Sequence, residues 1–113
     1  MQRGEVWVAN LNPNRGAEIG KIRPVLILQA DFLTALGEPT VVVLPLTSQV
    51  RPAKEPLRVT IRARDRLEQD SQVVSEQPRT LDRARLTEGP LTRLTGEEMK
   101  AVERSFRAVT GLI

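Results

Sequence analysis

Two stretches of the sequence place chemically active side chains at the ends of apolar runs. Arg23 directly precedes a proline and the aliphatic run 25–28, while Thr47 and Ser48 directly follow the aliphatic run 40–46. Because a residue before proline is biased toward extended backbone, we expect Arg23 to be held at the mouth of a strand. A guanidinium matches phosphate with two parallel N–H donors, and a hydroxyl can add another. If both runs are strands of one small sheet, these groups can meet at one end of it.

The residue types that are missing narrow the chemistry further. The sequence has no Cys and no His, which excludes a disulfide framework, a cysteine nucleophile, an imidazole acid or base and a zinc site of the usual kind. Any catalysis must therefore use carboxylates, arginine, lysine or hydroxyls. No hydrophobic segment follows the N-terminus and no apolar run approaches the length of a membrane span, so we expect a cytoplasmic protein without a membrane segment.

Length and composition indicate one small domain over residues 1–113. Domains of this size gain stability from an additional partner surface, so we expect a homodimer. The three aromatic residues are Trp7, Phe32 and Phe106, which predicts an aliphatic core. So few aromatic residues also argue against base stacking as the main way of holding a nucleic acid.

Positive charge is concentrated in the first part of the chain. Residues 1–66 contain ten Lys and Arg against six Asp and Glu, whereas residues 67–113 contain seven against eight. The segment 51–66 is especially basic, and a polyanion such as RNA or an acidic protein segment is a natural partner for it. A solvated basic surface without a partner is an equally good interpretation of the charge alone.

Hydrophobic patterns predict a mainly β fold with one C-terminal helix, arranged as a small barrel or curled antiparallel sheet. The proline at position 45 indicates that its strand bulges or lies at an edge. The loop 12–20 leads into Arg23 and is either a substrate lid or an ordinary hairpin loop, the second being favoured. We expect strands over 5–11, 24–29, 40–46, 57–62 and 71–77, helical turns over 31–37 and 80–86, and loops over 12–20, 49–56 and 89–90.

The last element has the signature of an amphipathic helix. Thr95 and Glu98 fit the capping-box pattern at its start. Its apolar residues recur at helical spacing, which indicates core packing or a dimer contact. They are Met99, Val102, Phe106, Val109 and either Leu112 or Ile113.

Several short motifs, in this order and spacing, make the chain resemble the MazF/PemK (Kid) family of toxin endoribonucleases from toxin–antitoxin systems. The resemblance covers nearly the whole length. The motifs are Arg3-Gly4-Glu5-Val6-Trp7, Gly16-Ala17-Glu18, Arg23-Pro24-Val25-Leu26-Ile27 with Gln29, Pro45-Leu46-Thr47-Ser48, and Glu76-Gln77-Pro78-Arg79-Thr80-Leu81-Asp82 with Arg85.

This resemblance implies an SH3-like barrel that forms a homodimer. It also implies sequence-specific cleavage of single-stranded RNA without a metal or another cofactor, giving a 2′,3′-cyclic phosphate and a 5′-hydroxyl. A cognate antitoxin would neutralise the toxin with a flexible acidic segment that covers the basic loop. A chain without His or Cys agrees with a reaction that needs no transition metal.

The resemblance places the family's catalytic arginine and threonine on Arg23 and Thr47. Arg23 suits stabilisation of charge on phosphoryl oxygens, and Thr47, with Ser48, suits donation to a phosphate oxygen. Glu76 stands where some family members have an aspartate, and it or Glu18 is the candidate general base. Alternatively, Glu76 only accepts hydrogen bonds from bases or backbone, and Glu18 is a structural partner of Arg23.

In those members an arginine and a histidine complete the site, but this chain has Val74 and Ala17 at the corresponding positions. The chemistry therefore rests mainly on the arginine and threonine. For phosphates of RNA the candidate ligands are Lys21, Ser48, Gln49, Arg51 and Lys54, and for base edges or backbone they are Gln77 and Arg79.

Two other functions fit the same general fold. One is a toxin directed at gyrase, although a poison that binds protein needs no phosphate site, so the Arg23 and Thr47 pair argues against it. The other is a non-catalytic SH3-like module that binds RNA or protein through the basic loop. Loss of Arg23 and Thr47 would leave that module nearly intact, whereas loss of Arg51 or Lys54 would abolish its binding.

Overall fold

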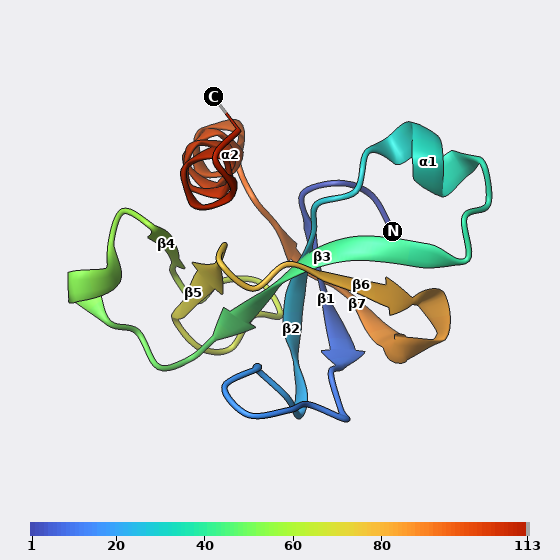
Figure 1. Ribbon diagram of the computed structural model, residues 1–113, viewed down its shortest axis with the longest axis horizontal. Coiled ribbons are helices and arrows are strands. Elements are labelled where there is room, and N and C mark those ends of the chain that lie inside the picture. The colour runs from blue at the N-terminus through green and yellow to red at the C-terminus, as the bar shows by residue number, and fades with distance from the viewer. Residues whose placement is uncertain (113) are drawn as a thin grey trace.

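A computed structural model describes residues 1–112 and shows an antiparallel sheet with one long helix at the C-terminal end (Figure 1). This confirms the expected fold class. Within the described residues no helix is both long enough and apolar enough to span a membrane. The elements are β1 (Glu5–Asn10), β2 (Ile22–Ile27), α1 (Asp31–Ala35), β3 (Thr40–Thr47), β4 (Arg58–Ile61), β5 (Ser71–Val74), β6 (Arg79–Asp82), β7 (Leu86–Arg93) and α2 (Gly96–Thr110), with 3-10 turns at Pro52–Lys54 and Arg83–Arg85.

The sheet runs in the order β4, β5, β3, β2, β1, β7, and β6 pairs separately with β3. All of its strand pairs are antiparallel, and the order leaves β4 and β7 at the ends of an open sheet. Strand β2 is central, between β1 and β3, as its continuous apolar run predicts. The two strands that carry Arg23 and Thr47 are therefore direct neighbours.

Pro45 does not mark an edge or a bulge, so that prediction is wrong. It lies opposite Val25 in the regular pairing of β2 with β3. On its other side, β3 pairs with β6 over residues 40–43 and with β5 over residues 46–47, and Pro45 falls between the two. A proline is tolerated inside this central strand because its missing N–H coincides with the change of partner.

The helical turn expected over 80–86 is confirmed only at Arg83–Arg85, a 3-10 turn that follows the end of β6. The loop expected over 89–90 is wrong, because these residues lie within the long strand β7. Gly89 lies within β7 and contacts the Trp7 ring. The strand needs a glycine at this position because a Cβ would lie 2.3 Å from Trp7 Cδ2. The expected strand 71–77 also ends early, at Val74.

Helix α2 confirms the predicted capping box and apolar stripe. The Glu98 backbone N–H donates to Thr95 Oγ1, and the Thr95 N–H donates to Glu98 Oε1. Val102 is fully buried, and Met99 and Phe106 pack on the same aliphatic cluster beneath the sheet. Leu112 is 59% exposed, and Ile113 lies outside the described residues.

The loop between β1 and β2 is fixed to the chain near β6. The side-chain amide of Gln77 accepts from the Ile19 N–H at 2.8 Å and donates to the Ala17 carbonyl at 3.3 Å. The Arg79 guanidinium donates to the carbonyls of Ile19 and Leu11. These hydrogen bonds fix the loop against the sheet, which agrees with an ordinary hairpin loop, the favoured interpretation, rather than with a mobile substrate lid.

We predict that Leu44→Ala lowers the free energy of unfolding by about 2–5 kcal/mol, because Leu44 is fully buried in the aliphatic core. Urea denaturation at a fixed protein concentration measures this. The matched control is Leu36→Ala on the surface, where Leu36 is 73% exposed, and its effect should stay within about 0.5 kcal/mol. Equal losses for the two variants would contradict the placement of the core.

We predict that Gln77→Ala speeds hydrogen exchange of the Ile19 amide about fivefold, since the amide loses a partner that contributes roughly 1 kcal/mol. Exchange measured residue by residue with NMR gives the result. Gln2→Ala removes an amide of equal size from the N-terminal segment and should leave the loop unchanged. Unaltered exchange of Ile19 in Gln77→Ala would show that the side chain does not fix the loop.

Candidate active site

The Arg23 guanidinium is held by a hydrogen bond from one nitrogen, Nε, which leaves its two terminal nitrogens available. Its Nε donates to the Gly20 carbonyl at 2.8 Å, at the point where the β1–β2 loop enters β2. The side chain is half-buried, and it lines a pocket of about 720 Å³. A guanidinium anchored through Nε still presents its two terminal nitrogens, which is the geometry that binds phosphate oxygens in a bidentate manner.

Thr47 ends β3, the strand next to β2. The pairing of β2 with β3 extends as far as Val25 opposite Pro45, so Arg23 and Thr47 each lie two residues beyond that last pair, and Thr47 itself pairs with Gln72 of β5. Thr47 is 8% exposed, and its Oγ1 accepts from the Gln49 backbone N–H at 3.2 Å. Accepting that bond orients the hydroxyl and leaves its proton for another acceptor.

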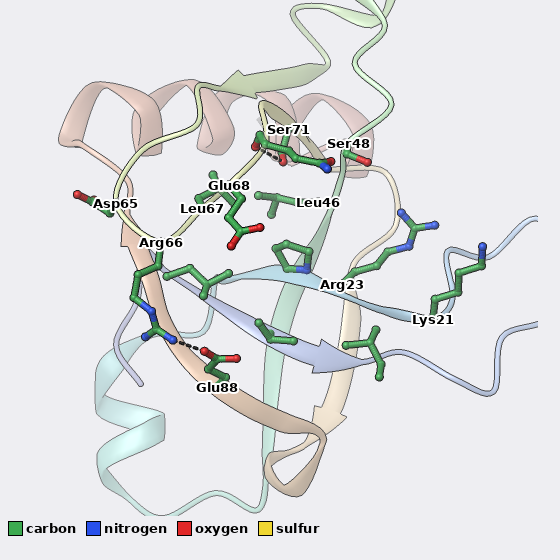
Figure 2. Close-up of a pocket in the computed structure, with 15 residues that line it drawn as sticks. Lys21, Arg23, Leu46, Ser48, Asp65, Arg66, Leu67, Glu68, Ser71 and Glu88 are labelled. Carbon is green, nitrogen blue, oxygen red and sulfur yellow. Dashed lines mark hydrogen bonds and ion pairs between the residues drawn. The ribbon is translucent and has the colours of Figure 1, made fainter.

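Ser48 and Lys21 line the pocket together with Arg23, and Figure 2 shows Lys21 and Arg23 on one side of it. Ser48 follows the end of β3 and is exposed. The backbone of Lys21 has a φ of 69° and donates its N–H to Asn12 Oδ1. Lys21, Arg23 and Ser48 are therefore brought together at one end of the sheet. Thr47, which directly precedes Ser48, is mostly buried and does not line the pocket.

Most of the opposite wall comes from the segment 65–69, in which the sequence showed only irregular charge, and β5 and β7 add one residue each. The residues of this wall are Asp65, Arg66, Leu67, Glu68, Gln69, Ser71 and Glu88, and apolar residues from the strands complete the pocket, namely Val8, Ile22, Pro24, Leu46 and Leu91. Sequence patterns did not indicate this wall because the loop 62–70 has no periodicity. It reaches the pocket only through the way β4 and β5 pair.

Arg64 anchors this wall to the start of α2. Its guanidinium makes two hydrogen bonds to the Glu98 carboxylate, at 2.6 and 2.8 Å. These bonds, more than simple charge attraction, lower the pKa of the Glu98 carboxyl and raise the pKa of Arg64. Further along the wall, Arg66 pairs with Glu88.

The basic loop after β3 is held by a buried amide that the sequence analysis missed. Gln72 is fully buried on β5, accepts from the Arg51 N–H at 3.0 Å and donates to the Arg51 carbonyl at 3.1 Å. With the backbone fixed, the side chains of Gln49, Arg51 and Lys54 are exposed. Arg51 also contacts Gln49 at 3.5 Å. All four residues of β5 are buried, so alternation along the strand gave no signal for Gln72 or for its partner.

The two candidate bases lie apart from the pocket. The Glu76 carboxylate forms an ion pair with Arg58 at 3.3 Å, in a turn beyond the end of β5. The Glu18 carboxylate accepts from the Arg15 N–H within the β1–β2 loop. Glu18 is therefore not the structural partner of Arg23, which is the Gly20 carbonyl.

The polar side-chain groups of Gln77 and Arg79 form hydrogen bonds with the backbone of the β1–β2 loop. A contact of either side chain with RNA stays a prediction. Their observed partners are backbone groups that lead directly to Gly20 and hence to Arg23.

A family comparison and a comparison with individual proteins indicate the same family. Residues 2–110 match the family described as PemK-like, MazF-like toxin of type II toxin-antitoxin system. The chain is 42% identical to Endoribonuclease MazF of Staphylococcus saprophyticus subsp. saprophyticus over 99% of its own length and 92% of that protein.

Solved structures share the fold. The structure of MazF from Deinococcus radiodurans superposes with a TM-score of 0.83 at 24% identity, covering 98% of this chain and 96% of that one. An endoribonuclease in complex with its cognate antitoxin from a mycobacterial species gives 0.78 at 22% identity, covering 100% and 97%. Because the family match spans almost all of the sequence, the chain belongs to the PemK/MazF family of type II toxin–antitoxin toxins.

Proposed function

We propose that the chain is a sequence-specific toxin endoribonuclease that cleaves single-stranded RNA by attack of a ribose 2′-hydroxyl on the adjacent phosphorus. The products are a 2′,3′-cyclic phosphate and a 5′-hydroxyl. The observation that carries this proposal is the pocket at the end of β2 and β3 that Lys21, Arg23 and Ser48 line, with Thr47 directly before Ser48 at the end of β3. The activity named for the Staphylococcus relative supports the same conclusion.

Arg23 stabilises the charge that builds up on the phosphoryl oxygens, since its side chain lines the pocket and its Nε already donates to the Gly20 carbonyl. The Thr47 hydroxyl, oriented by the Gln49 N–H, donates to a phosphate oxygen and helps to align the attack. The nucleophile belongs to the substrate, and the proposed reaction uses neither a metal nor a cofactor. The protein contributes positioning and electrostatic stabilisation.

The proton acceptor for the 2′-hydroxyl stays a prediction, with Glu76 and Glu18 as the candidates. Glu76 bonds Arg58 through Oε2, which leaves Oε1 able to accept a proton. Glu18 uses Oε1 within its own loop. A guanidinium has only N–H donors and no acceptor, so Arg23 is not assigned this role.

RNA phosphates are bound by exposed groups around the pocket and on the basic loop, namely Lys21, Ser48, Gln49, Arg51 and Lys54. The half-buried Gln77 and Arg79, beside the β1–β2 loop, contact base edges or backbone of the RNA. Phosphate contacts supply affinity and position the strand, whereas contacts to base edges supply sequence preference. We place the RNA in a groove shared by two subunits of a homodimer.

The cognate antitoxin competes for the same surface with a flexible acidic segment over Arg51 and Lys54. Complexes of relatives with antitoxins support this partner, among them the MazE–MazF structure of Deinococcus radiodurans. A cytoplasmic location, where messenger RNA is available, belongs to the same proposal.

We predict that Arg23→Ala lowers the rate of RNA cleavage at least hundredfold, equivalent to about 2.7 kcal/mol of transition-state stabilisation. Single-turnover cleavage of a fluorescent oligonucleotide measures the rate, and circular dichroism checks folding. Arg15→Ala removes an exposed arginine from the neighbouring loop and is the control, with an unchanged rate expected. A loss below tenfold in Arg23→Ala would contradict the role of Arg23.

We predict that the double variant Arg51→Gln, Lys54→Gln makes RNA binding less sensitive to salt. Loss of two phosphate contacts should reduce the slope of log K against log salt by about 1.4, at roughly 0.7 per contact on a single strand. Fluorescence anisotropy with uncleavable 2′-deoxy-substituted RNA gives the slopes. Lys100→Gln, on the exposed side of α2, is the matched control. An unchanged slope in the double variant would show that Arg51 and Lys54 do not contact RNA phosphates.

A further inference from the structure

The pocket beside Arg23 has two walls of opposite charge. Lys21 and Arg23 lie on one side, and Glu68 lies across the pocket from them with its carboxylate directed inward (Figure 2). The strands that form the rest of the pocket supply apolar surface, including the half-buried Pro24 and the 67% exposed Ile22. A ligand suited to this pocket has an anionic end, a flat apolar body and an opposite edge with hydrogen-bond donors.

Glu68 is the acidic group of this wall that has no partner within residues 1–112. The neighbouring Glu88 is paired with Arg66, and Asp65 accepts a hydrogen bond from the Thr92 hydroxyl at 2.7 Å. By contrast, the Glu68 carboxylate takes part in none of the hydrogen bonds or ion pairs of these residues, although it lines the pocket. Its two oxygens are therefore free to accept from a ligand.

A single nucleotide has the three features that the pocket requires. Its phosphate suits the cationic wall, its base is flat and largely apolar on both faces, and its base edge carries donors or acceptors. The free carboxylate disfavours a phosphate on its own side. A nucleotide can therefore enter in only one orientation, with the phosphate at Arg23 and the base edge at Glu68.

From this arrangement we infer that the pocket binds the nucleotide next to the scissile phosphate and that Glu68 selects its base. A carboxylate has two acceptor oxygens and no donor, so guanine fits best by donating its N1–H and N2–H groups together. Uracil fits worst, because carbonyl oxygens flank its one N–H and face the carboxylate. This inference rests on the endoribonuclease function proposed above and assigns it a base preference at one position.

The test compares cleavage of an RNA library with random sequence by the wild-type protein and by Glu68→Gln, with the cut ends sequenced. The substitution keeps the shape of the side chain and replaces one acceptor oxygen by a donor. We expect the wild type to favour guanine over uracil at one position beside the cut. In Glu68→Gln that preference should fall about tenfold, with the other positions unchanged.

Glu38→Gln, an exposed glutamate before β3, is the matched control and should retain the wild-type profile. An identical profile for Glu68→Gln and the wild type overturns the inference, as does a wild type without preference for guanine at a position beside the cut. Either result leaves the proposed endoribonuclease function standing.

Binding of free nucleotides separates failure of the inference from failure of the proposed function. Titration of the intact protein with guanosine 3′-monophosphate and with uridine 3′-monophosphate, followed by NMR, requires no cleavage. A preference for the guanosine nucleotide that disappears in Glu68→Gln supports the subsite even if the protein does not cleave RNA. Equal affinity of the wild type for the two nucleotides overturns it.

Discussion

The arrangement of the site depends on hydrogen bonds from side chains to the backbone of the β1–β2 loop. Carbonyl groups outside a strand ladder must find donors elsewhere. Gln77, Arg79 and Arg85 supply such donors from the chain around β6, and Arg23 supplies the donor for the Gly20 carbonyl. Because these side chains stand on or next to the sheet, the loop shares its rigidity. The Arg23 guanidinium is thereby fixed with its terminal nitrogens free, before any substrate arrives.

Local patterns were sufficient for the features that depend on neighbours in the chain. The continuous aliphatic runs of β2 and β3 predicted two buried strands of one sheet, and the proline after Arg23 predicted its place near the start of a strand. Thr95 and Glu98 predicted the start of α2 by their spacing alone. The family followed from short motifs in a characteristic order.

Features that depend on distant parts of the chain could not be predicted. Gly89 resembles a turn in sequence, but it lies within β7, and the residue there is a glycine because Trp7, far away in the chain, leaves no room for a Cβ. The buried Gln72 binds the backbone of Arg51, and the free Glu68 faces a pocket formed by other strands. Neither role has a local signal, because each depends on how the strands pair. Likewise, Glu18 contacts Arg15 rather than Arg23, which only the path of the loop reveals.

The central claim is that the ribose 2′-hydroxyl of the substrate is the nucleophile and that the protein positions it with Arg23 and Thr47. The most direct measurement incubates the purified protein, with EDTA present, with an RNA oligonucleotide and with copies that carry single 2′-deoxy substitutions, followed by mass analysis of the ends. We expect cleavage to stop only when the 2′-hydroxyl before the cut is missing, and the product to carry a cyclic phosphate. Cleavage that survives that substitution, or no cleavage by folded protein free of antitoxin, would contradict the mechanism.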